Sequence, residues 1–468
     1  MEHTSSTSIK AARGLIAALI ALNLFRAITF PVTVGEAWNY DRYIGPPWRE
    51  ALAHYDPNNH VLNTLLVRIS TARFHLTELS LRLPSLLAGL LYLWVVYRLA
   101  VRRFGSGARA LTVIALLTLN PLVLDAMSEA RGYGMALAFL IWALELMLES
   151  AESFQEQNLN QQLTYQKVDA RKLNLAAVCL GLSVAASLAF AAPAVALGVV
   201  FLAWGRGWAW PKGRGTGFAL LAFLTAFVLV AVPIDHPDAG AFLQGATSLR
   251  QTLNELTVLS LGTSLQVVTA AARVAMAIVA ISGAVAAFRM ERRPESALVV
   301  LTGGTLALTL LILLASHRWL HAPFPQRGAI YLVPLSTLAV TSIILKWNRE
   351  AAHNTLYAVT ALLIAFYLSQ MDFHAYTTGQ EFAGGKALAK MLRAEVGRRR
   401  VSIGVSEAAE PIVNYYRTRF RQGNWQRIER KPLEHHYEYY VLAGPDRALV
   451  GQWHLQVLFQ DAGLILAQ

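Results

Sequence analysis

Runs of about 20 apolar residues, separated by charged residues, proline or glycine, recur along most of this 468-residue chain. A helix of that length crosses the hydrocarbon core of a bilayer, where no water can satisfy an exposed backbone. Hydrophobic residues make up 55% of the chain and charged residues only 15%, which is far from the balance of a soluble domain. We therefore expect an α-helical polytopic membrane protein. Eleven predicted spans cover residues 12–31, 82–99, 110–126, 134–149, 174–189, 191–204, 216–233, 265–287, 297–315, 328–345 and 354–369.

The distribution of Lys and Arg predicts the orientation of these spans. With the amino terminus in the cytoplasm, the cytoplasmic connections hold 17 Lys and Arg, and the outer connections hold 8. The runs 174–189 and 191–204 share one apolar stretch, so they could form one long helix or a re-entrant pair. A single helix would reverse every later connection and remove the bias, which favours eleven crossings. We expect a multi-pass protein of the cell (inner) membrane with its carboxy-terminal domain outside.

Several other classes of protein are disfavoured by the same composition. The formal net charge is +12, but the basic residues fall in short runs between apolar stretches, which argues against a nucleic-acid partner. Cys179 is the single cysteine, so neither an intrachain disulfide nor a cysteine metal site can form. Lys10 and Arg13 precede the first apolar run, and no small-residue cleavage site follows it, so we expect a retained first span.

The longest predicted outer connection, residues 32–81, begins with Glu36 a few residues beyond the first span. Apolar residues at helical spacing in 48–54 and 61–74 predict interfacial helices. An isolated glutamate at such a place is usually a solvated carboxylate. If it is a lone carboxylate at a partly apolar interface, its replacement by Gln should change folding little.

Two further outer connections carry polar side chains. SEARGYG places Glu129, Arg131 and Tyr133 within a turn or two, and SHRWLHAPFPQRG supplies His317 and Arg327. A simpler interpretation of the first segment is a Glu129–Arg131 ion pair at the interface, which would stabilise the protein little. A simpler interpretation of the second is that its basic residues contact lipid headgroups.

Two arginines, Arg26 and Arg273, fall inside predicted spans. An unpaired charge there is costly and usually faces a cavity or a partner. Arg26 lies near the outer end of its span and could simply extend to the headgroups. The sequence names no partner for Arg273, and we place neither arginine in the catalytic core.

The order of four segments resembles a known family. They are the long first outer connection that opens on an acidic residue, ELSLRLPSLLAGLLYLWVVYRLAVRRFG, SEARGYGMALAFLIWAL and PFPQRGAIYLVPL. Together they resemble bacterial GT-C membrane glycosyltransferases, the group related to protein O-mannosyltransferases and aminoarabinose transferases. The resemblance implies a polyprenyl-phosphate sugar donor and an essential acid at Glu36. Relatives often have an Asp-Glu pair there, where this chain has Gly35, and NNHVLNT with His60 replaces a His-Pro-Pro type motif.

Physical chemistry assigns roles to these residues. Sugar transfer from a lipid phosphate needs a base for the acceptor proton and cations for the departing phosphate. Glu36 is the expected base, and Arg131 and Arg327 offer planar forks suited to phosphate oxygens. His60, Tyr133 and His317 complete the expected donor site. Glu129 is expected to hold the acceptor, orient Arg131 or help Glu36 bind a divalent cation, and a metal requirement stays open.

Residues 371–468 form a polar segment after the last span, which predicts a small soluble α/β domain outside the membrane. Residues 1–370 form the predicted transmembrane domain. Within the small domain we expect helices near 384–397 and 410–420 and strands near 401–406 and 437–444. It contains no phosphate loop, nucleophile elbow or metal-ligand spacing, and acceptor docking or covering of the site are its expected roles.

The predicted function is transfer of a hexose or pentose from a polyprenyl-phosphate donor to a lipid, glycan or protein acceptor at the outer face, among membrane lipids. A lipid-linked oligosaccharide ligase or polymerase is an alternative enzyme. A membrane transporter is the alternative of another class, although it predicts broken helices in two related halves, and no internal repeat is visible. A structural assembly subunit is a further alternative if Glu36 is dispensable. The sequence identifies neither the sugar nor the acceptor.

Overall fold

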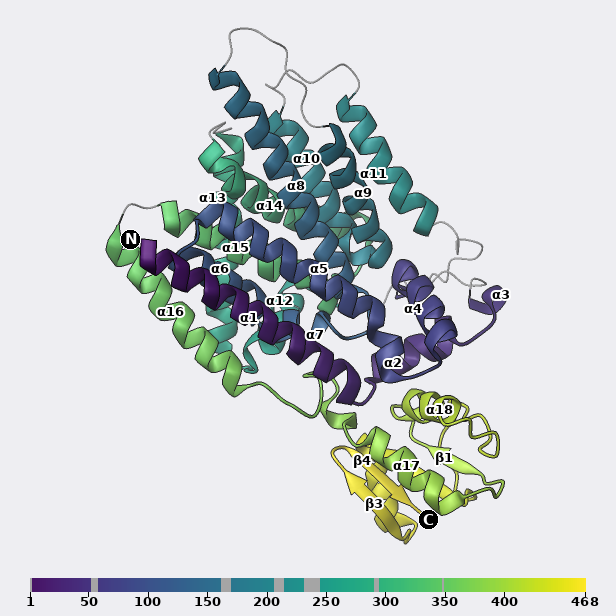
Figure 1. The fold of residues 1–468 in the computed structure, drawn as a ribbon. Helices are drawn as coiled ribbons and strands as arrows, with labels where there is room; N and C mark the ends of the chain where they lie inside the picture. The colour runs from purple at the N-terminus through teal and green to yellow at the C-terminus, as the bar shows by residue number, and fades with distance from the viewer. Residues whose placement is uncertain are drawn as a thin grey trace.

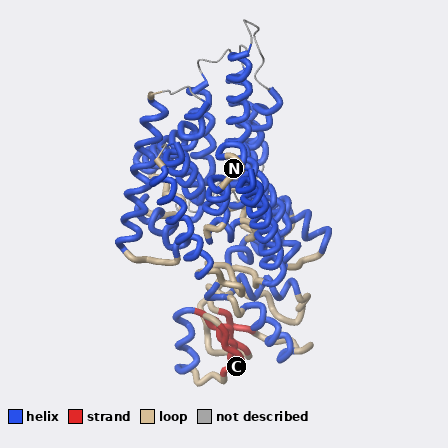
Figure 2. The backbone as a smooth tube through the Cα atoms, turned by 60° about the vertical axis from the view of Figure 1, so that its left-hand side comes forward, coloured by secondary structure: helices blue, strands red, loops and turns tan. Residues whose placement is uncertain are grey.

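The computed structural model describes residues 2–51, 58–160, 170–205, 214–230, 245–289, 294–346 and 349–468. Long helices form a bundle, and a small α/β unit lies at one end of it, below α2 (Val34–Asn39) in the view of Figure 1. The bundle helices are α1 (Glu2–Thr29), α5 (Glu78–Phe104), α6 (Ala108–Thr118), α7 (Pro121–Ala126), α8 (Tyr133–Asn160), α9 (Ala170–Ala186), α10 (Ala191–Trp204), α11 (Arg214–Val230), α12 (Leu249–Leu261), α13 (Gln266–Phe288), α14 (Pro294–Leu320), α15 (Leu332–Lys346) and α16 (Glu350–Ser369). Figure 2 shows the same separation of a helical bundle from a sheet near the carboxy terminus.

Helices cover most of the described residues of each of the eleven predicted spans, with short breaks in some of them; residues 231–233 of the seventh lie outside the described part. Within that part, seven helices are long and apolar enough to cross a membrane. α6, α9, α10 and α11 have only 11, 17, 14 and 17 residues. The predicted mostly helical, multi-span fold is therefore confirmed, and the count of eleven crossings stays a prediction.

The predicted span 110–126 is divided into α6 and α7 for a local reason. Asn120 is the N-cap of α7, and its side-chain oxygen accepts hydrogen bonds from the backbone N–H groups of Leu122 and Val123. Pro121 has no N–H to donate and takes the first helical position. A single helix through this point would lose these caps.

The apolar stretch 174–204 forms two helices, not one. α9 ends at Ala186, a 3₁₀ turn, η2 (Leu188–Phe190), follows, and α10 begins at Ala191. α9 packs against α8 and α11, whereas α10 packs mainly against α14. The turn between them lies next to η5 (Arg327–Tyr331), a 3₁₀ turn that precedes α15.

The predicted long first connection is largely helical. It contains α2 (Val34–Asn39), a π-helical turn η1 (Tyr40–Ile44), α3 (Trp48–Ala51) and α4 (Val61–Phe74). The helix predicted over 61–74 is confirmed. The helix predicted over 48–54 is present as α3, and its last residues lie outside the described part.

The carboxy-terminal unit has a four-stranded sheet of order β1-β2-β4-β3. β1 (Ile403–Val405) pairs in parallel with β2 (Tyr439–Ala443), and β3 (Val457–Asp461) and β4 (Leu464–Ala467) complete it in antiparallel fashion. α17 (Gly385–Val396) and α18 (Glu410–Arg419) lie where helices were predicted. The β3–β4 hairpin was not predicted, because its two-residue turn, Ala462–Gly463, has alanine at φ 47°, where Gly, Asn or Asp is usual.

Ion pairs and apolar contacts join this unit to the bundle. Glu78, the first residue of α5, pairs with Arg419 of α18 and lies 3.2 Å from Lys386 Nζ of α17. Tyr416 Oη accepts a hydrogen bond of 3.2 Å from the backbone N–H of Val32. The carboxy-terminal unit therefore packs on the segment that leads from α1 into α2.

A second charged cluster lies toward the opposite end of the bundle from the carboxy-terminal unit. Glu149 of α8 is buried, and its carboxylate lies 2.5 Å from Arg102 Nη1 of α5 and 3.0 Å from Lys172 Nζ of α9. These pairs tie α5, α8 and α9 together.

Candidate active site

Glu36 forms a closed ion pair with Arg82 of α5. Arg82 Nε donates to Glu36 Oε1 at 2.8 Å, and Arg82 Nη2 donates to Oε2 at 2.6 Å, the bidentate geometry of a strong pair. The backbone N–H groups of Ala130 and Thr33 donate to the same two oxygens at 2.8 and 2.9 Å. Both charged side chains are fully buried. Glu36 is therefore a fully bonded carboxylate in this structure.

The local sequence explains the position of this pair. Thr33 is the N-cap of α2 and accepts from the backbone N–H of Glu36, while the Glu36 carboxylate accepts from the N–H of Thr33. This reciprocal arrangement is a capping box. Arg82 in turn donates to the carbonyls of Phe30 and Pro31 at 2.9 and 2.8 Å, just beyond the end of α1. The Arg82 guanidinium therefore binds both the segment that follows α1 and the first turn of α2.

The expectation that Glu36 is a lone carboxylate is wrong, because its partner lies 46 residues away on another helix. The sequence reasoning missed Arg82. The TVGE segment, with Thr33 three residues before Glu36, is a capping-box pattern and was the available signal that this carboxylate has a structural partner.

Glu129 lies in the turn between α7 and α8 and pairs with Arg327. Arg327 Nη2 donates to Glu129 Oε2 at 2.9 Å, and Thr33 Oγ1 donates to Oε1 at 3.1 Å. Burial raises the pKa of Glu129, but the charges of Arg327 and Arg131 outweigh burial and place the pKa below its usual value. Glu129 is therefore ionised at neutral pH, and its ion-pair partner is Arg327, not the Arg131 that the simpler sequence reading gave it.

Arg131 lies directly over Gly35. A Cβ atom at Gly35 would be only 2.7 Å from Arg131 Nη1, so the guanidinium occupies the space where any other residue would place its side chain. The Arg131 Cζ also lies 5.5 Å from the ring centroid of Tyr133. The neighbouring backbone N–H of Ala130 is bound by Glu36, which fixes the turn that carries Arg131.

A cavity of about 600 Å³ lies beside this cluster. His60, Arg131, Tyr133 and Arg327 line its polar side. Its apolar side is made by α10 and α14, through Ala191, Ala192, Val195, Ile312 and Leu313. Val195 is 56% exposed, so the apolar side continues to the outer surface of the bundle. The cavity has the shape and chemistry for an amphiphile with an anionic head.

Four of the side chains that line this cavity carry a buried polar atom without a partner among the residues that the structure describes. They are His60 Nδ1, Arg131 Nε, Ser187 Oγ and Arg327 Nε. A buried donor or acceptor without a partner costs about 1–3 kcal/mol, so native proteins rarely gather several in one place. These four are therefore candidate contacts for a bound ligand.

Gly132 brings His60 and Ser187 to the same cavity. Its φ is +76°, and a Cβ there would lie 2.5 Å from the carbonyl oxygen of Ala186 and 2.9 Å from His60 Cβ. Burial, and secondly the charge of Arg131, lowers the pKa of His60 to about 3, so the imidazole is neutral. Ser187 was not singled out from the sequence. The short SLAFAAP interruption between the two apolar runs was the available signal.

The other predicted site residues lie behind the cavity wall. Glu36 and Glu129 do not line the cavity: Glu129 pairs with Arg327 of its polar side, and Glu36 binds the backbone N–H of Ala130, the residue before Arg131. His317 Nδ1 is 2.9 Å from the carbonyl oxygen of Ala322, and its ring centroid is 4.5 Å from that of Phe324. Because Ala322 and Phe324 line the cavity, His317 supports its rim. In the described residues, no group of three or more His, Cys, Asp or Glu side chains could hold a metal ion.

Arg26 has a buried partner that the sequence did not reveal. It forms an ion pair with Asp125 of α7, and Asp125 Oδ2 accepts a 2.9 Å hydrogen bond from the backbone N–H of Thr377. The ring of Tyr376 lies 4.9 Å from Arg26 Cζ and 4.8 Å from Arg82 Cζ. The segment after α16 is therefore bound to the same end of the bundle as the Glu36–Arg82 pair.

One family model matches part of the chain. Residues 31–206 match the family model of the alpha-(1->6)-mannopyranosyltransferase N-terminal domain. The matched range includes His60, Glu129, Arg131 and Ser187 and excludes Arg327. Curated proteins provide no sequence match.

Solved structures provide the stronger evidence for the architecture. The apo structure of ArnT from Cupriavidus metallidurans is 14% identical, with a TM-score of 0.56 over 98% of each chain. The structure of the same enzyme bound to undecaprenyl phosphate is 13% identical, with a TM-score of 0.54 over 97% of each chain. The chain has the GT-C fold.

This GT-C fold extends from the first helix through the carboxy-terminal unit, since the alignments with ArnT cover nearly the whole of both chains. The archaeal oligosaccharyltransferase AglB from Archaeoglobus fulgidus also matches, at 13% identity and a TM-score of 0.45, over 86% of this chain and 63% of AglB. The two ArnT structures confirm the predicted resemblance at the level of the fold.

Proposed function

We propose that this protein is a membrane glycosyltransferase that moves a hexose from a polyprenyl-phosphate donor to a lipid, glycan or protein acceptor. The observation that carries the proposal is the pair Arg131 and Arg327, which line one amphiphilic cavity with unpartnered Nε donors. The GT-C fold and the mannosyltransferase family match support the same class of reaction. A polyprenyl-phosphate mannose is therefore the first donor to test.

The two arginines bind the donor phosphate in this proposal. Planar guanidinium groups donate in parallel to phosphate oxygens, and their charge stabilises the phosphate as it leaves. The apolar side of the cavity, formed by α10 and α14, accommodates the first part of the prenyl chain. His60 is neutral, so it hydrogen-bonds to the donor head without adding charge.

The acceptor hydroxyl attacks the anomeric carbon, the bond from that carbon to the phosphate oxygen breaks, and the phosphate keeps the bonding electrons. The acceptor proton passes to a base. Glu36 is the candidate from the sequence, and Glu129 is the second. Each must first lose a guanidinium partner, Arg82 for Glu36 and Arg327 for Glu129.

Donor binding affects these two ion pairs differently. A phosphate in the cavity competes for Arg327, which lines the cavity, but not for Arg82, which does not. We therefore assign the base to Glu129 and give Glu36 the positioning of residues 129–131 through the Ala130 N–H. The assignment of the base to Glu36 remains a prediction that the same experiment decides.

Purified protein in nanodiscs, supplied with polyprenyl-phosphate mannose and a membrane extract as acceptor, tests this proposal. Release of polyprenyl phosphate should require the protein and fall by about two to four powers of ten in Glu129→Gln. Glu36→Gln should lower total transfer only because less of the protein is folded. The activity per folded molecule should stay close to that of the wild type. If Glu129→Gln keeps full activity and Glu36→Gln loses activity per folded molecule, Glu36 is the base.

A further inference from the structure

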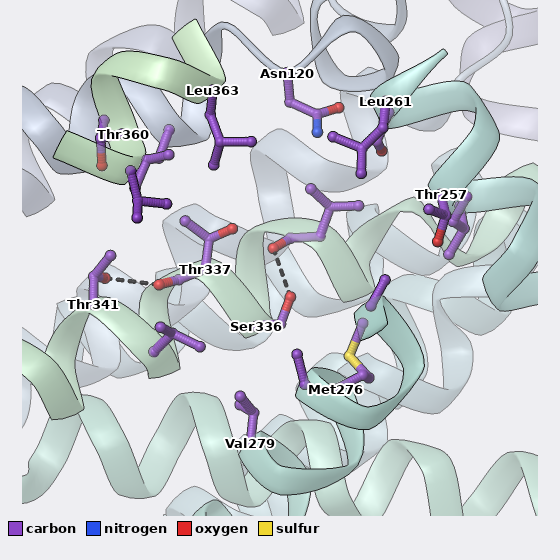
Figure 3. Close-up of a pocket in the computed structure, with 18 of the residues that line it drawn as sticks. Asn120, Thr257, Leu261, Met276, Val279, Ser336, Thr337, Thr341, Thr360 and Leu363 are labelled. Atoms are coloured by element: carbon purple, nitrogen blue, oxygen red, sulfur yellow. Dashed lines mark hydrogen bonds between the residues drawn. The ribbon is translucent and has the colours of Figure 1, made fainter. Parts of the chain in front are cut away.

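A second cavity, of about 380 Å³, lies between α6, α12, α13, α15 and α16. Its walls are mostly aliphatic, and Figure 3 shows side chains of several helices pointing into it, among them Met276, Val279 and Leu363. Its lining residues include none that line the cavity of Arg131 and Arg327. It is therefore a separate site.

The lining also contains buried polar groups without a partner in the described part of the chain. Ser260 on α12 and Thr360 on α16 are 7% and 3% exposed, and neither hydroxyl has a hydrogen-bond partner there. Other hydroxyls of the lining are satisfied, because Ser336 and Thr341 donate to carbonyls of their own helix. Ser260 and Thr360 are thus available to a ligand.

Arg273 of α13 supplies a positive charge to this cavity. Its Nε donates to the carbonyl of Thr269 in the preceding turn at 3.2 Å, and no carboxylate of the described residues forms an ion pair with it. Arg273 lies seven residues, about 10 Å, from the first residue of α13. A long side chain at that depth reaches the headgroup level of a bilayer.

The cavity is accessible from the surrounding lipid. Val359 of α16 lines it and is 47% exposed, and Ala275 of α13 also lines it and is exposed. α13 and α16 turn most of their apolar surface outward, with 17% of each span buried. A molecule that enters here comes from the bilayer, with an apolar chain for the aliphatic walls and an anion for Arg273.

We propose that this cavity binds one chain and the phosphate of an anionic glycerophospholipid, a second lipid distinct from the sugar donor. The bulk lipid of the membrane far exceeds any prenyl lipid in concentration, which favours its occupancy by mass action. The hydroxyls of Ser260 and Thr360 donate to the ester oxygens. The proposal does not depend on the glycosyltransferase assignment.

Native mass spectrometry of the delipidated full chain, titrated with phosphatidylglycerol, phosphatidylcholine or undecaprenyl phosphate, tests the proposal. The wild type should bind one phosphatidylglycerol more tightly than phosphatidylcholine. Arg273→Gln should lose this preference, about tenfold in affinity, and Ala272→Phe should block both lipids by filling the cavity. Arg250→Gln, at an exposed arginine of the neighbouring α12, is the matched control and should bind like the wild type.

Two results would overturn the proposal. One is an unchanged phosphatidylglycerol affinity in Arg273→Gln. The other is undecaprenyl phosphate binding that depends on Arg273 and displaces phosphatidylglycerol, which would assign this cavity to the donor chain. A failure of the proposed function would give a different result: undecaprenyl phosphate would bind equally well when Arg131 and Arg327 are replaced.

Discussion

Two buried charged clusters, Glu36–Arg82 and Arg131–Arg327, are linked through Ala130 and differ in whether their polar atoms have partners. The Glu36–Arg82 pair is closed, because carboxylate and guanidinium bind each other and the remaining donors meet backbone groups. The Arg131–Arg327 cluster is open, because both guanidinium groups line a cavity and retain an unpartnered Nε. A satisfied buried pair stabilises a fold, whereas unsatisfied donors around a cavity are available to a ligand. We therefore expect a structural role for the first cluster and propose donor binding for the second.

The largest expected effect concerns the closed cluster. Glu36→Gln leaves the buried Arg82 without a counter-charge, which should destabilise the protein by about 3–5 kcal/mol. Thermal unfolding in detergent measures it. Glu407→Gln removes one member of an exposed pair with Arg430 and should change stability by no more than about 1 kcal/mol. Equal unfolding temperatures for Glu36→Gln and wild type would show that the first cluster is not structural.

A fall in pH should also lower the free energy of unfolding, by less than Glu36→Gln does, and part of this loss should come from His60. Its pKa is about 3 in the folded protein and ordinarily 6.5, so the unfolded chain takes up a proton first as the pH falls. The folded state therefore loses stability between about pH 6.5 and pH 3, by about 2 kcal/mol at pH 5. His60→Gln should lack this loss when unfolding is followed at pH 7 and pH 5. Identical losses in both proteins would mean that His60 is accessible to protons.

The smallest expected effect concerns the position of Arg131 in the Arg131–Arg327 cluster. Gly35→Ala places a methyl group where the Arg131 guanidinium lies and should displace it without altering any charge. We expect donor affinity to fall about tenfold, or about 1.4 kcal/mol. Gly107→Ala is the control, since nothing lies within 4 Å of a Cβ there. An unaffected donor affinity in Gly35→Ala would show that the exact position of Arg131 is unimportant.

Much of the fold was predictable because apolar runs of bilayer length can form little other than helices. Helical spacing also predicted α4, α17 and α18. The hairpin of β3 and β4 was not predictable in the same way, since Ala462 at positive φ is a weak turn signal.

Four of the seven predicted site residues share one cavity in the structure, and the other three do not line it. Arg131, Arg327, His60 and Tyr133 do line one cavity, but the pairing of Glu129 with Arg327 joins residues 198 positions apart, and no local pattern specifies it. The partner of Glu36 is equally remote, and position in the sequence alone could not show whether that carboxylate is free or bonded.

We propose above that Arg131 and Arg327 bind the phosphate of a polyprenyl donor. The most direct measurement is the affinity of undecaprenyl phosphate for the purified protein and for Arg131→Lys and Arg327→Lys, which keep the charge but lose the planar fork. We expect each lysine variant to bind at least tenfold more weakly, while Arg427→Lys, at an exposed pair with Asp41, binds like the wild type. Unchanged affinity in both lysine variants and in the corresponding alanine variants would contradict it, and the donor phosphate would have to lie elsewhere.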